Sequence, residues 1–398
     1  MIKYIPLFFI LVSCAVFQKN KTDQAQSAAM QRFVVNDSEN ELYTRFRYKP
    51  VKGLGYEEGT HRRDPSSIIK VNDTYYVWYT YCKDNKSSWL NADLWYAKSK
   101  DGETWSEQGP AVERGKDGAW DDYSVFTTNI LVTNNKYYLT YQARSKTEQR
   151  NVVGMAWANS PNGPWTKLAD PILRTTPDGE LRDEHKKGFS DYVHNVKTKG
   201  SWDSGAIHDP GVIVRDGKYY LYYKGHGVGD LMHADSKWGL AIAEYPEGPY
   251  VKSPYNPVTN SGHEIWVFPW KTGIAAIVDW AGPEKGTVQY SENGIDFEVV
   301  TALEDIPPAG GAYIADKFLD TKNGQGFDWG LCHYGRSDWT FLVRFDCDLK
   351  RDSKKQLNWN QFRHYSTIRD VMLDPERFGV TNEKLQGRQK IKKNKKSN

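Results

Sequence analysis

The chain has 398 residues, of which 14% are aromatic and 33 are glycine, a composition that is typical of a β-rich globular protein and excludes collagen, coiled coil or disorder as the main architecture. The formal charge is +3, but residues 384–398 hold seven basic and no acidic side chains, and subtracting these seven from +3 leaves −4. Because the body of the protein has no basic excess, we expect no nucleic-acid partner.

The first residues have the pattern of an export signal. One lysine precedes an apolar run from Ile5 to Val12, which is too short to span a bilayer. Leu11-Val12-Ser13-Cys14 resembles a bacterial lipobox. We therefore expect residues 1–13 to be a lipoprotein signal peptide and Cys14 to carry the lipid that tethers the protein to a membrane in a Gram-negative envelope. An ordinary cleaved leader with an incidental cysteine is the alternative.

Residues 14–60 are expected to form a linker and a helical arm. Ser38-Glu39-Asn40-Glu41 has a capping-box pattern, and we predict two short helices within 22–48. Helices of this length are not stable alone, so their apolar side chains need a surface, which a partner subunit would supply in a homodimer. These side chains include Met30, Phe33, Leu42 and Phe46.

From His61 onward the sequence changes to short strands separated by turns, and it repeats. A hairpin with an aromatic second strand occurs at 68–79, 130–141 and 212–223. Its turns are Asn-Asp, Asn-Asn and Asp-Gly, which tolerate the positive φ that two-residue hairpins require. A second turn signature ending in glycine recurs at 99–102, 160–163, 245–248 and 291–294.

The spacing of this repeat predicts a β-propeller. The four signature glycines lie 61, 85 and 46 residues apart, about the length of a four-stranded sheet with variable loops, and a weaker fifth unit fits between Gly310 and Asp348. We expect an all-β fold: a five-bladed β-propeller over 61–350, preceded by a short N-terminal helix-turn-helix arm and followed by a C-terminal extension, 351–398, with a basic tail. A β-sandwich with repeated hairpins is the alternative.

Polar residues just before each hairpin should converge on one mouth of the channel, because the innermost strand of every blade lines it. Asp64 and Asp209 occupy equivalent places in the repeat, each followed by proline. Grouped carboxylates supply what glycosidic cleavage needs: an ionised group that activates water, a proton donor, and a charge that separates their pKa values. The candidates are Asp64, Asp122, His208, Asp209, His263 and Glu264.

Other chemistries lack their motifs. The sequence contains no Gly-rich phosphate loop, Gly-x-Ser-x-Gly elbow or His-Glu-x-x-His helix. Cys82, Cys332 and Cys347 form no disulfide framework, and no Cys-x-x-Cys or His-x-x-x-His spacing offers a metal site. We expect no required cofactor, with a structural cation in the central channel left open.

Four segments within residues 27–350 resemble glycoside hydrolase family 117: Thr60–Ser66, Tyr76–Thr80, His208–Pro210 and His263-Glu264. The resemblance implies an exo-acting, inverting α-1,3-(3,6-anhydro-L-galactosidase) that releases anhydro-galactose from the non-reducing end of neoagaro-oligosaccharides, on a propeller like those of families 43 and 32. It also implies a helix-turn-helix exchanged between two subunits with a Ser-x-Ala-x-x-Arg motif, which 27–32 matches.

The resemblance also implies roles for the candidates. Asp64 would be the general base and Asp209 the carboxylate that orients groups and tunes pKa values. The family uses as acid a histidine that stands here at His263, whereas the broader propeller pattern would use Glu264. Neighbouring residues on a regular strand face opposite sides, so we expect one of this pair to face the sugar unless the strand start is irregular. The residues expected to bind substrate are Arg63, Thr128, Gln142 and His208.

Two departures from the family put the substrate in question. Agar-active members carry Ser-x-Thr-Thr where this chain has Ser124-Val125-Phe126-Thr127-Thr128, and the stretch 174–205 is a long insertion of the kind that shapes a binding mouth. The alternatives are a family 43-like arabinosidase or xylosidase and a non-catalytic surface lipoprotein that binds glycans.

Overall fold

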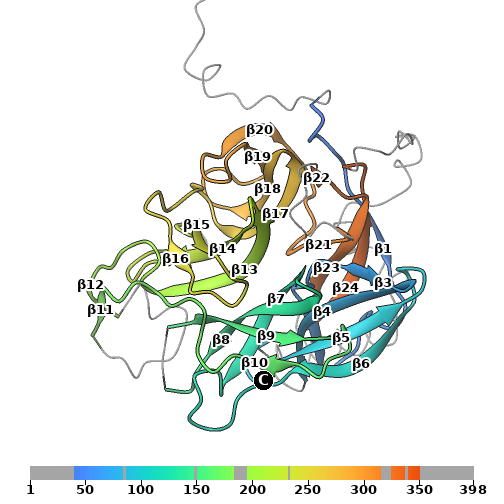
Figure 1. The fold of residues 1–398 in the computed structure, drawn as a ribbon, viewed down its shortest axis with the longest axis horizontal. Helices are drawn as coiled ribbons and strands as arrows, with labels where there is room; N and C mark the ends of the chain where they lie inside the picture. Colours follow the sequence, from blue (N-terminus) through green and yellow to red (C-terminus); the bar gives the residue numbers. More distant parts are fainter. Residues whose placement is uncertain are drawn as a thin grey trace, which may run out of the picture. The chain divides into compact units, whose positions relative to one another are not determined.

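The computed structural model describes residues 40–83, 87–147, 150–182, 195–231, 234–314, 324–336 and 339–349. Every regular element among them is a β-strand, and five sheets of four or five strands are arranged around a central axis (Figure 1). The all-β, five-bladed prediction is confirmed. No helix long and apolar enough to cross a membrane occurs in these ranges. The predicted signal peptide, the Cys14 anchor, the 27–32 motif and the 351–398 extension lie outside the described residues.

In the first three blades the strands lie in chain order from the innermost to the outermost. The exception is β3, which pairs with β4, as β2 does. Blade one contains β2 (Thr60–Arg63), β3 (Ile69–Val71), β4 (Thr74–Lys83), β5 (Asp93–Ser99) and β6 (Trp105–Val112). Blade two contains β7 (Ser124–Thr133), β8 (Lys136–Arg144), β9 (Val152–Ala158) and β10 (Thr166–Lys167). Blade three contains β13 (Ala206–Arg215), β14 (Lys218–His226), β15 (Lys237–Ala243) and β16 (Val251–Lys252).

The last two blades depart from this simple order. Blade four contains β17 (His263–Lys271), β18 (Gly273–Ala281), β19 (Thr287–Ser291) and β20 (Glu298–Ala302), with β22 (Gly324–Gln325) paired to β17. Blade five contains β21 (Gly311–Ala312), β23 (Trp329–Arg336), β24 (Trp339–Asp346) and, outermost, β1 (Arg47–Pro50). Between blades two and three, β11 (Glu180–Leu181) pairs with β12 (Val196–Thr198) inside the 174–205 insertion.

The three predicted hairpins form as expected. In blades one, two and three the closing pairs enclose two-residue turns, and the turn residues adopt the positive φ that selects asparagine, aspartate and glycine. The closing pairs are Val71–Thr74, Thr133–Lys136 and Arg215–Lys218, and the turn residues are Asn72, Asp73, Asn134, Asn135, Asp216 and Gly217.

Large aromatic rings fill the space between neighbouring blades, which accounts for the aromatic composition. Trp78 of blade one, fully buried, contacts Trp165 beside blade two edge to face at 5.7 Å between centroids. Trp266 of blade four contacts Phe345 of blade five at 5.5 Å. Because the twisted sheets diverge outward, such bulky side chains hold adjacent blades in register.

The propeller begins before residue 61, inside the segment predicted as an arm. Strand β1 pairs antiparallel with β24, from Arg47 opposite Asp346 to Pro50 opposite Val343, and so completes blade five with the start of the domain. The 22–48 helical prediction is therefore wrong over 40–48, where the chain forms a turn and the start of β1. Leu42 and Phe46 are buried in the core of this chain, and Phe46, just before β1, contacts Trp266 of blade four and Phe345 of blade five. Residues 22–39 lie outside the described ranges.

Candidate active site

A cavity of about 620 Å³ opens among the innermost strands at the centre of the propeller. Every candidate taken from the sequence except Asp122 lines it, so the structure brings together residues from four blades that are up to 201 positions apart in sequence, from Arg63 to Glu264. These lining residues are Arg63, Asp64, Thr128, Gln142, His208, Asp209, His263 and Glu264. The prediction that the blade starts converge on one mouth is thereby confirmed for blades one, three and four.

The same backbone irregularity occurs at the inner edge of each blade. One cavity-lining non-glycine residue per blade has φ between 44° and 52°, a region that L-residues rarely adopt, and register shifts mark an irregularity at three of the five positions. A bulge re-aims a side chain, and here it turns these residues toward the cavity. The five residues are Asp64, Thr127, Asp209, Glu264 and Ala309.

The bulge at β17 decides the question of which neighbour faces the cavity. His263 pairs with Ala281 and Ile265 pairs with Val278, so the register shifts here and Glu264 alone stands opposite two residues of β18, Asp279 and Trp280. Both His263 and Glu264 line the cavity. The expectation that only one of them faces it holds for regular strands and fails here because the strand start is irregular.

Asp64 is a buried carboxylate surrounded by donors. Arg63 Nε donates to Oδ2 at 2.7 Å and Arg63 Nη2 to Oδ1 at 3.1 Å, while Thr127 Oγ1 donates to Oδ2 at 3.3 Å. His333 Nδ1 lies 3.2 Å from Oδ1. Burial opposes ionisation, but Arg63 and then His333 outweigh it and hold the pKa of Asp64 well below its usual range. This carboxylate is ionised throughout the neutral and mildly acidic range.

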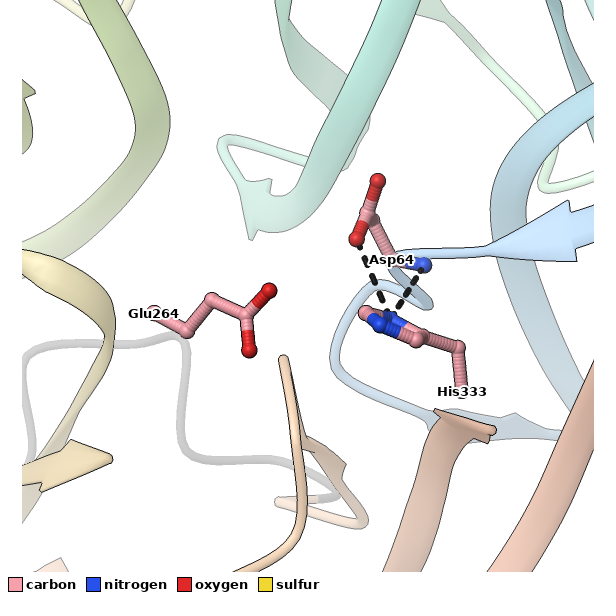
Figure 2. A group of neighbouring side chains, drawn as sticks. All are labelled: Asp64, Glu264 and His333. Atoms are coloured by element: carbon pink, nitrogen blue, oxygen red, sulfur yellow. Dashed lines mark hydrogen bonds and ion pairs between the residues drawn. The ribbon is translucent and has the colours of Figure 1, made fainter. Parts of the chain in front are cut away.

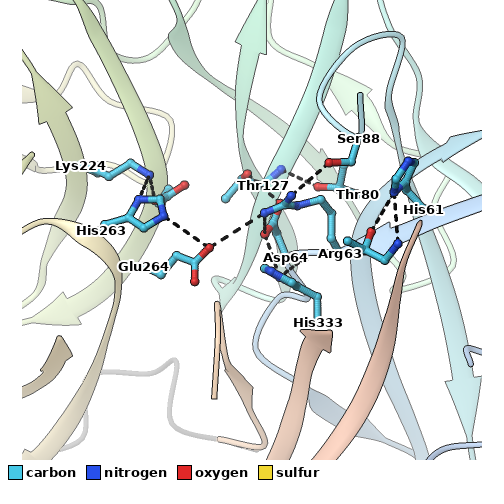
Figure 3. Close-up of polar contacts among 12 residues, drawn as sticks. His61, Arg63, Asp64, Thr80, Ser88, Thr127, Lys224, His263, Glu264 and His333 are labelled. Carbon is cyan, nitrogen blue, oxygen red and sulfur yellow. Dashed lines mark hydrogen bonds and ion pairs between the residues drawn. The ribbon is translucent and has the colours of Figure 1, made fainter. Parts of the chain in front are cut away.

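Arg63 is itself held in place from three sides (Figure 3). Its Nη1 donates to Ser88 Oγ at 3.0 Å, its guanidinium carbon lies 4.2 Å from the centroid of the Trp89 ring, and its Nη2 lies 3.9 Å from Glu264 Oε1. The guanidinium therefore bridges Asp64 and Glu264, and Trp89 forms part of the cavity rim.

A second chain of charged groups runs from Asp209 to Glu264, and Figure 3 shows its members Lys224, His263 and Glu264. Lys224 Nζ lies 2.5 Å from Asp209 Oδ2 and 3.3 Å from His263 Nδ1, and His263 Nε2 lies 3.7 Å from Glu264 Oε1. Burial raises the pKa of Asp209; Lys224 opposes this, and the charges of Asp64 and Glu264 reinforce it. Four titratable groups from three strands are thus electrostatically linked.

Asp279 of β18 lies beneath Glu264. Burial, followed by the charge of Glu264 and a hydrogen bond with it, raises the pKa of Asp279 well above its usual range. Two adjacent carboxyl groups out of water hold a proton between them more readily than either would alone. Burial and the charges of Asp279 and Glu264 also raise the pKa of the Cys332 thiol, which keeps it protonated and unreactive.

The remaining candidates, Thr128, Gln142 and His208, also line the cavity. Gln142 Nε2 and His208 Nδ1 are 2.6 Å apart, and the His208 ring stacks on His226 with centroids 5.0 Å apart. Thr128 lines the cavity, but its hydroxyl donates to the Thr140 carbonyl at 2.8 Å. The blade-two residue that turns toward Asp64 is the preceding Thr127.

The placement of Asp122 at the mouth was wrong. Its carboxylate accepts the backbone N–H of Gly118 at 2.9 Å and of Lys146 at 2.8 Å, outside the cavity. Asp122 is therefore a turn-capping residue. Thr127 occupies the position in blade two that Asp64 and Asp209 occupy in blades one and three.

Sequence reasoning missed three polar residues that lie outside the blade starts. Lys224 in β14, Asp279 in β18 and His333 in β23 all line the cavity, whereas Gln142 in β8 was the one second-strand residue among the predicted candidates. Asp279 interrupts a strand that is otherwise apolar, and Lys224 and His333 each follow a run of apolar or aromatic residues. A polar residue in such a run was the available signal. No described residue of the 174–205 insertion lines the cavity.

Asp64, Glu264 and His333 form the one group of potential metal ligands found among the described residues, with one ligand atom from each within 4.8 Å of the others (Figure 2). The guanidinium of Arg63 already contacts both oxygens of Asp64 and lies 3.9 Å from Glu264. The guanidinium of Arg63 thus already supplies the positive charge between these carboxylates. With that side chain in this position, the three residues do not fit a metal ion.

Comparisons with known proteins agree with this geometry. The sequence model of glycosyl hydrolases family 43 matches residues 59–183, and no match was found among curated proteins. Two solved structures share the fold. Sucrose-6-phosphate hydrolase from Lactobacillus gasseri is 13% identical, and the match covers 77% of this chain and 60% of that one at a TM-score of 0.51. A GH32 β-fructofuranosidase from Bombyx mori is 11% identical, and the match covers 75% of this chain and 61% of that one at a TM-score of 0.50.

A third structure is much more similar in sequence. It is a family 117 glycoside hydrolase produced by the marine bacterium Zobellia galactanivorans, 37% identical, with the match covering 80% of this chain and 94% of that one at a TM-score of 0.68. Identity at this level over most of both chains, together with the shared propeller, shows that this chain belongs to glycoside hydrolase family 117.

Proposed function

We propose that this glycosidase is an exo-acting, inverting enzyme that releases 3,6-anhydro-L-galactose, or a closely related sugar, from the non-reducing end of agar-type oligosaccharides. The observation that carries the proposal is the central cavity, whose wall brings the buried carboxylate of Asp64 together with Asp209, His263 and Glu264. Its volume of about 620 Å³ is that of a small-ligand pocket rather than a long open cleft, which suits removal of one terminal sugar.

Asp64 is the general base in this proposal. Its carboxylate accepts a proton from the water that attacks the anomeric carbon, and its interactions with Arg63 and His333 keep it ionised before the reaction. Thr127 and Arg63 fix the orientation of its oxygens through three hydrogen bonds. Asp209, held by Lys224, orients groups in the cavity and contributes the negative charge that separates the pKa values of its neighbours.

His263 is the general acid in this proposal, and Glu264 is a supporting carboxylate. Inverting enzymes hold their two catalytic groups about 6.5–9.5 Å apart to leave room for water. An oxygen of Glu264 lies within 4.8 Å of an Asp64 oxygen, too close for the opposite side of a sugar ring. His263 lies beyond Glu264 in the chain of contacts, with Nε2 3.7 Å from the nearer carboxylate oxygen.

The test is incubation of the wild-type enzyme with neoagarobiose and longer red-algal oligosaccharides, followed by product chromatography, with aryl arabinosides and xylosides in parallel. We expect a monosaccharide and an oligomer one sugar shorter. Release of internal oligomers would exclude exo action. Turnover of the aryl pentosides alone would favour the arabinosidase or xylosidase alternative, and tight binding without turnover across the panel would favour a glycan-binding protein.

A further inference from the structure

Lys224 is a buried cation in the wall of the cavity for which the mechanism so far gives no role beyond holding Asp209. It lies on β14, 7% exposed, with its ammonium group between Asp209 Oδ2 at 2.5 Å and His263 Nδ1 at 3.3 Å (Figure 3). The ion pair with Asp209 accounts for the burial of the charge. It does not account for the contact with the imidazole.

The contact with Lys224 determines where the proton of His263 sits. An ammonium group has three donors and no acceptor, so His263 Nδ1 must accept the hydrogen bond and carries no proton of its own. The ring proton is then on Nε2, the nitrogen that lies 3.7 Å from Glu264 Oε1. The neighbouring positive charge also disfavours the imidazolium form.

A neutral imidazole that gives up its Nε2 proton becomes an anion unless Nδ1 takes up another proton at the same time. We propose that Lys224 fixes His263 in the Nε2–H tautomer and supplies, through Nδ1, the proton that His263 gives to the leaving oxygen. This inference rests on the proposed function, in which His263 is the acid. Lys224 acts through His263 and is therefore a positioning residue.

The proton transfers balance in a single concerted step. As the glycosidic C–O bond breaks, its electron pair stays on the leaving oxygen, which takes the Nε2 proton of His263 while Nδ1 takes a proton from Lys224 Nζ. Asp64 receives the proton of the attacking water. His263 ends as the opposite tautomer, Lys224 as a neutral amine beside Asp209; solvent then reprotonates Lys224 and accepts the proton from Asp64.

This arrangement predicts an unusual pH dependence. An imidazolium acid loses its proton above about pH 6.5, whereas a neutral imidazole supplied by a lysine keeps working at higher pH. The other charged groups around His263 are Glu264 beside it, Asp209 on β13, Asp279 on β18, and Arg63 and Asp64 at β2. The carboxylates favour the imidazolium, and Lys224 is the cation that contacts the ring directly.

Two substitutions separate supply of the proton from support of the fold. Lys224→Arg keeps a cation for Asp209 and a donor for Nδ1, but an arginine does not release its proton. Lys224→Met removes the charge and lets His263 become an imidazolium. Measured as kcat against pH with neoagarobiose, the Arg variant should fall about 10²–10⁴-fold at every pH. The Met variant should fall by that factor only above about pH 6.5.

Two further readouts exclude a merely structural role. With a dinitrophenyl glycoside of the released sugar, whose leaving group needs no proton, both variants should lose far less activity than with neoagarobiose. Nitrogen-15 NMR of histidine-labelled wild type at pH 7.5 should show His263 protonated at Nε2 alone. A Met variant with the wild-type pH profile, or a His263 protonated at Nδ1, would overturn the inference.

Failure of the proposed function would look different. If wild-type enzyme does not hydrolyse neoagarobiose, the substrate assignment is wrong, yet the NMR measurement still reads the tautomer of His263 directly. If the tautomer is as expected but both variants hydrolyse neoagarobiose at the wild-type rate, the proton-supply role of Lys224 is wrong and the substrate assignment stands.

Discussion

Asp64 and Asp279 show how one cavity drives two aspartates in opposite directions. Both are buried, which alone would raise both pKa values. Arg63 and His333 lower that of Asp64, while Asp279 has Glu264 as its main charged neighbour and keeps a raised pKa. The direction of each pKa shift therefore depends on the charged partner rather than on burial. Asp64 is ionised and can accept a proton, whereas Asp279 holds its proton.

Replacing Asp64 by asparagine should remove general-base assistance while keeping the volume of the side chain. We expect the Asp64→Asn variant to lose about 10²–10⁴-fold in kcat and to bind neoagarobiose with nearly unchanged affinity in calorimetry. Asp73→Asn is the matched control, since that side chain is 92% exposed and remote from the cavity. An Asp64→Asn variant that retains most of its activity would rule out the role of Asp64 as base.

The choice between His263 and Glu264 as acid depends on the leaving group. We expect His263→Ala to lose about 10²–10⁴-fold in kcat on neoagarobiose and to recover with a dinitrophenyl glycoside, because that leaving group departs without protonation. Glu264→Gln should stay impaired with both substrates. Recovery of Glu264→Gln alone would transfer the role of acid to Glu264.

Asp279→Asn should stabilise the protein increasingly as the pH rises. A carboxyl group whose pKa is raised on folding keeps its proton in the folded state, while the unfolded chain loses it above about pH 4. The free energy of unfolding therefore falls with pH between about 4 and the raised pKa, by up to about 1.4 kcal/mol per pH unit. The melting temperature of the variant relative to wild type should rise from pH 4 to pH 8. A difference that does not change with pH would contradict the raised pKa.

The sequence predicted the inner-strand residues of the site and, from the other strands, Gln142 alone. Asp64 and Asp209 could be found because the hairpin repeat marks equivalent positions. Lys224 reaches Asp209 and Asp279 reaches Glu264 because antiparallel pairing places β14 beside β13 and β18 beside β17. His333 reaches Asp64 from the neighbouring blade. Local sequence gives neither the register nor the packing of the blades. The bulge that turns Glu264 inward is likewise a tertiary feature, since its φ of 52° costs energy that packing must offset.

At the scale of elements, β1 is the strand that joins the two ends of the propeller. Arg47–Pro50 is four residues long and ends in proline, so it carries no strand signal of its own and was absorbed into the predicted arm. Its partner β24 lies about 300 residues later in the chain. The hairpin turns, by contrast, were predictable because each is encoded within a dozen consecutive residues.

The packing of Phe46 tests this closure. The ring is 8% exposed and contacts Trp266 and Phe345, with centroids 6.0 and 5.8 Å away. Phe46→Ala should lower the free energy of unfolding by about 3–5 kcal/mol, measured by urea denaturation. Tyr245→Ala, at a side chain that is 67% exposed, should change it by about 0.5 kcal/mol or less. Equal effects of the two substitutions would show that β1 is not part of the stable core.

For the whole molecule, the structure separates two segments that the sequence treated as one. We propose that the segment before residue 40 mediates a homodimer, while residues 40–50 belong to the propeller. A chain starting at residue 40 should therefore fold and run as a monomer in light scattering, whereas a chain starting at residue 51 should be unstable because it lacks Phe46 and β1. A chain starting at residue 40 that remains a dimer would show that other surfaces hold the subunits together.

The stereochemistry of hydrolysis tests the central claim most directly, because it depends on both the substrate and the disposition of Asp64 and His263. Proton NMR of neoagarobiose, recorded during the first minutes after wild-type enzyme is added, reports which anomer of the released sugar forms before it equilibrates in water. Single displacement predicts that the anomeric configuration of the first 3,6-anhydro-L-galactose is inverted relative to the glycosidic bond. Initial release of the anomer with the original configuration, or no release of this sugar at all, would contradict the account.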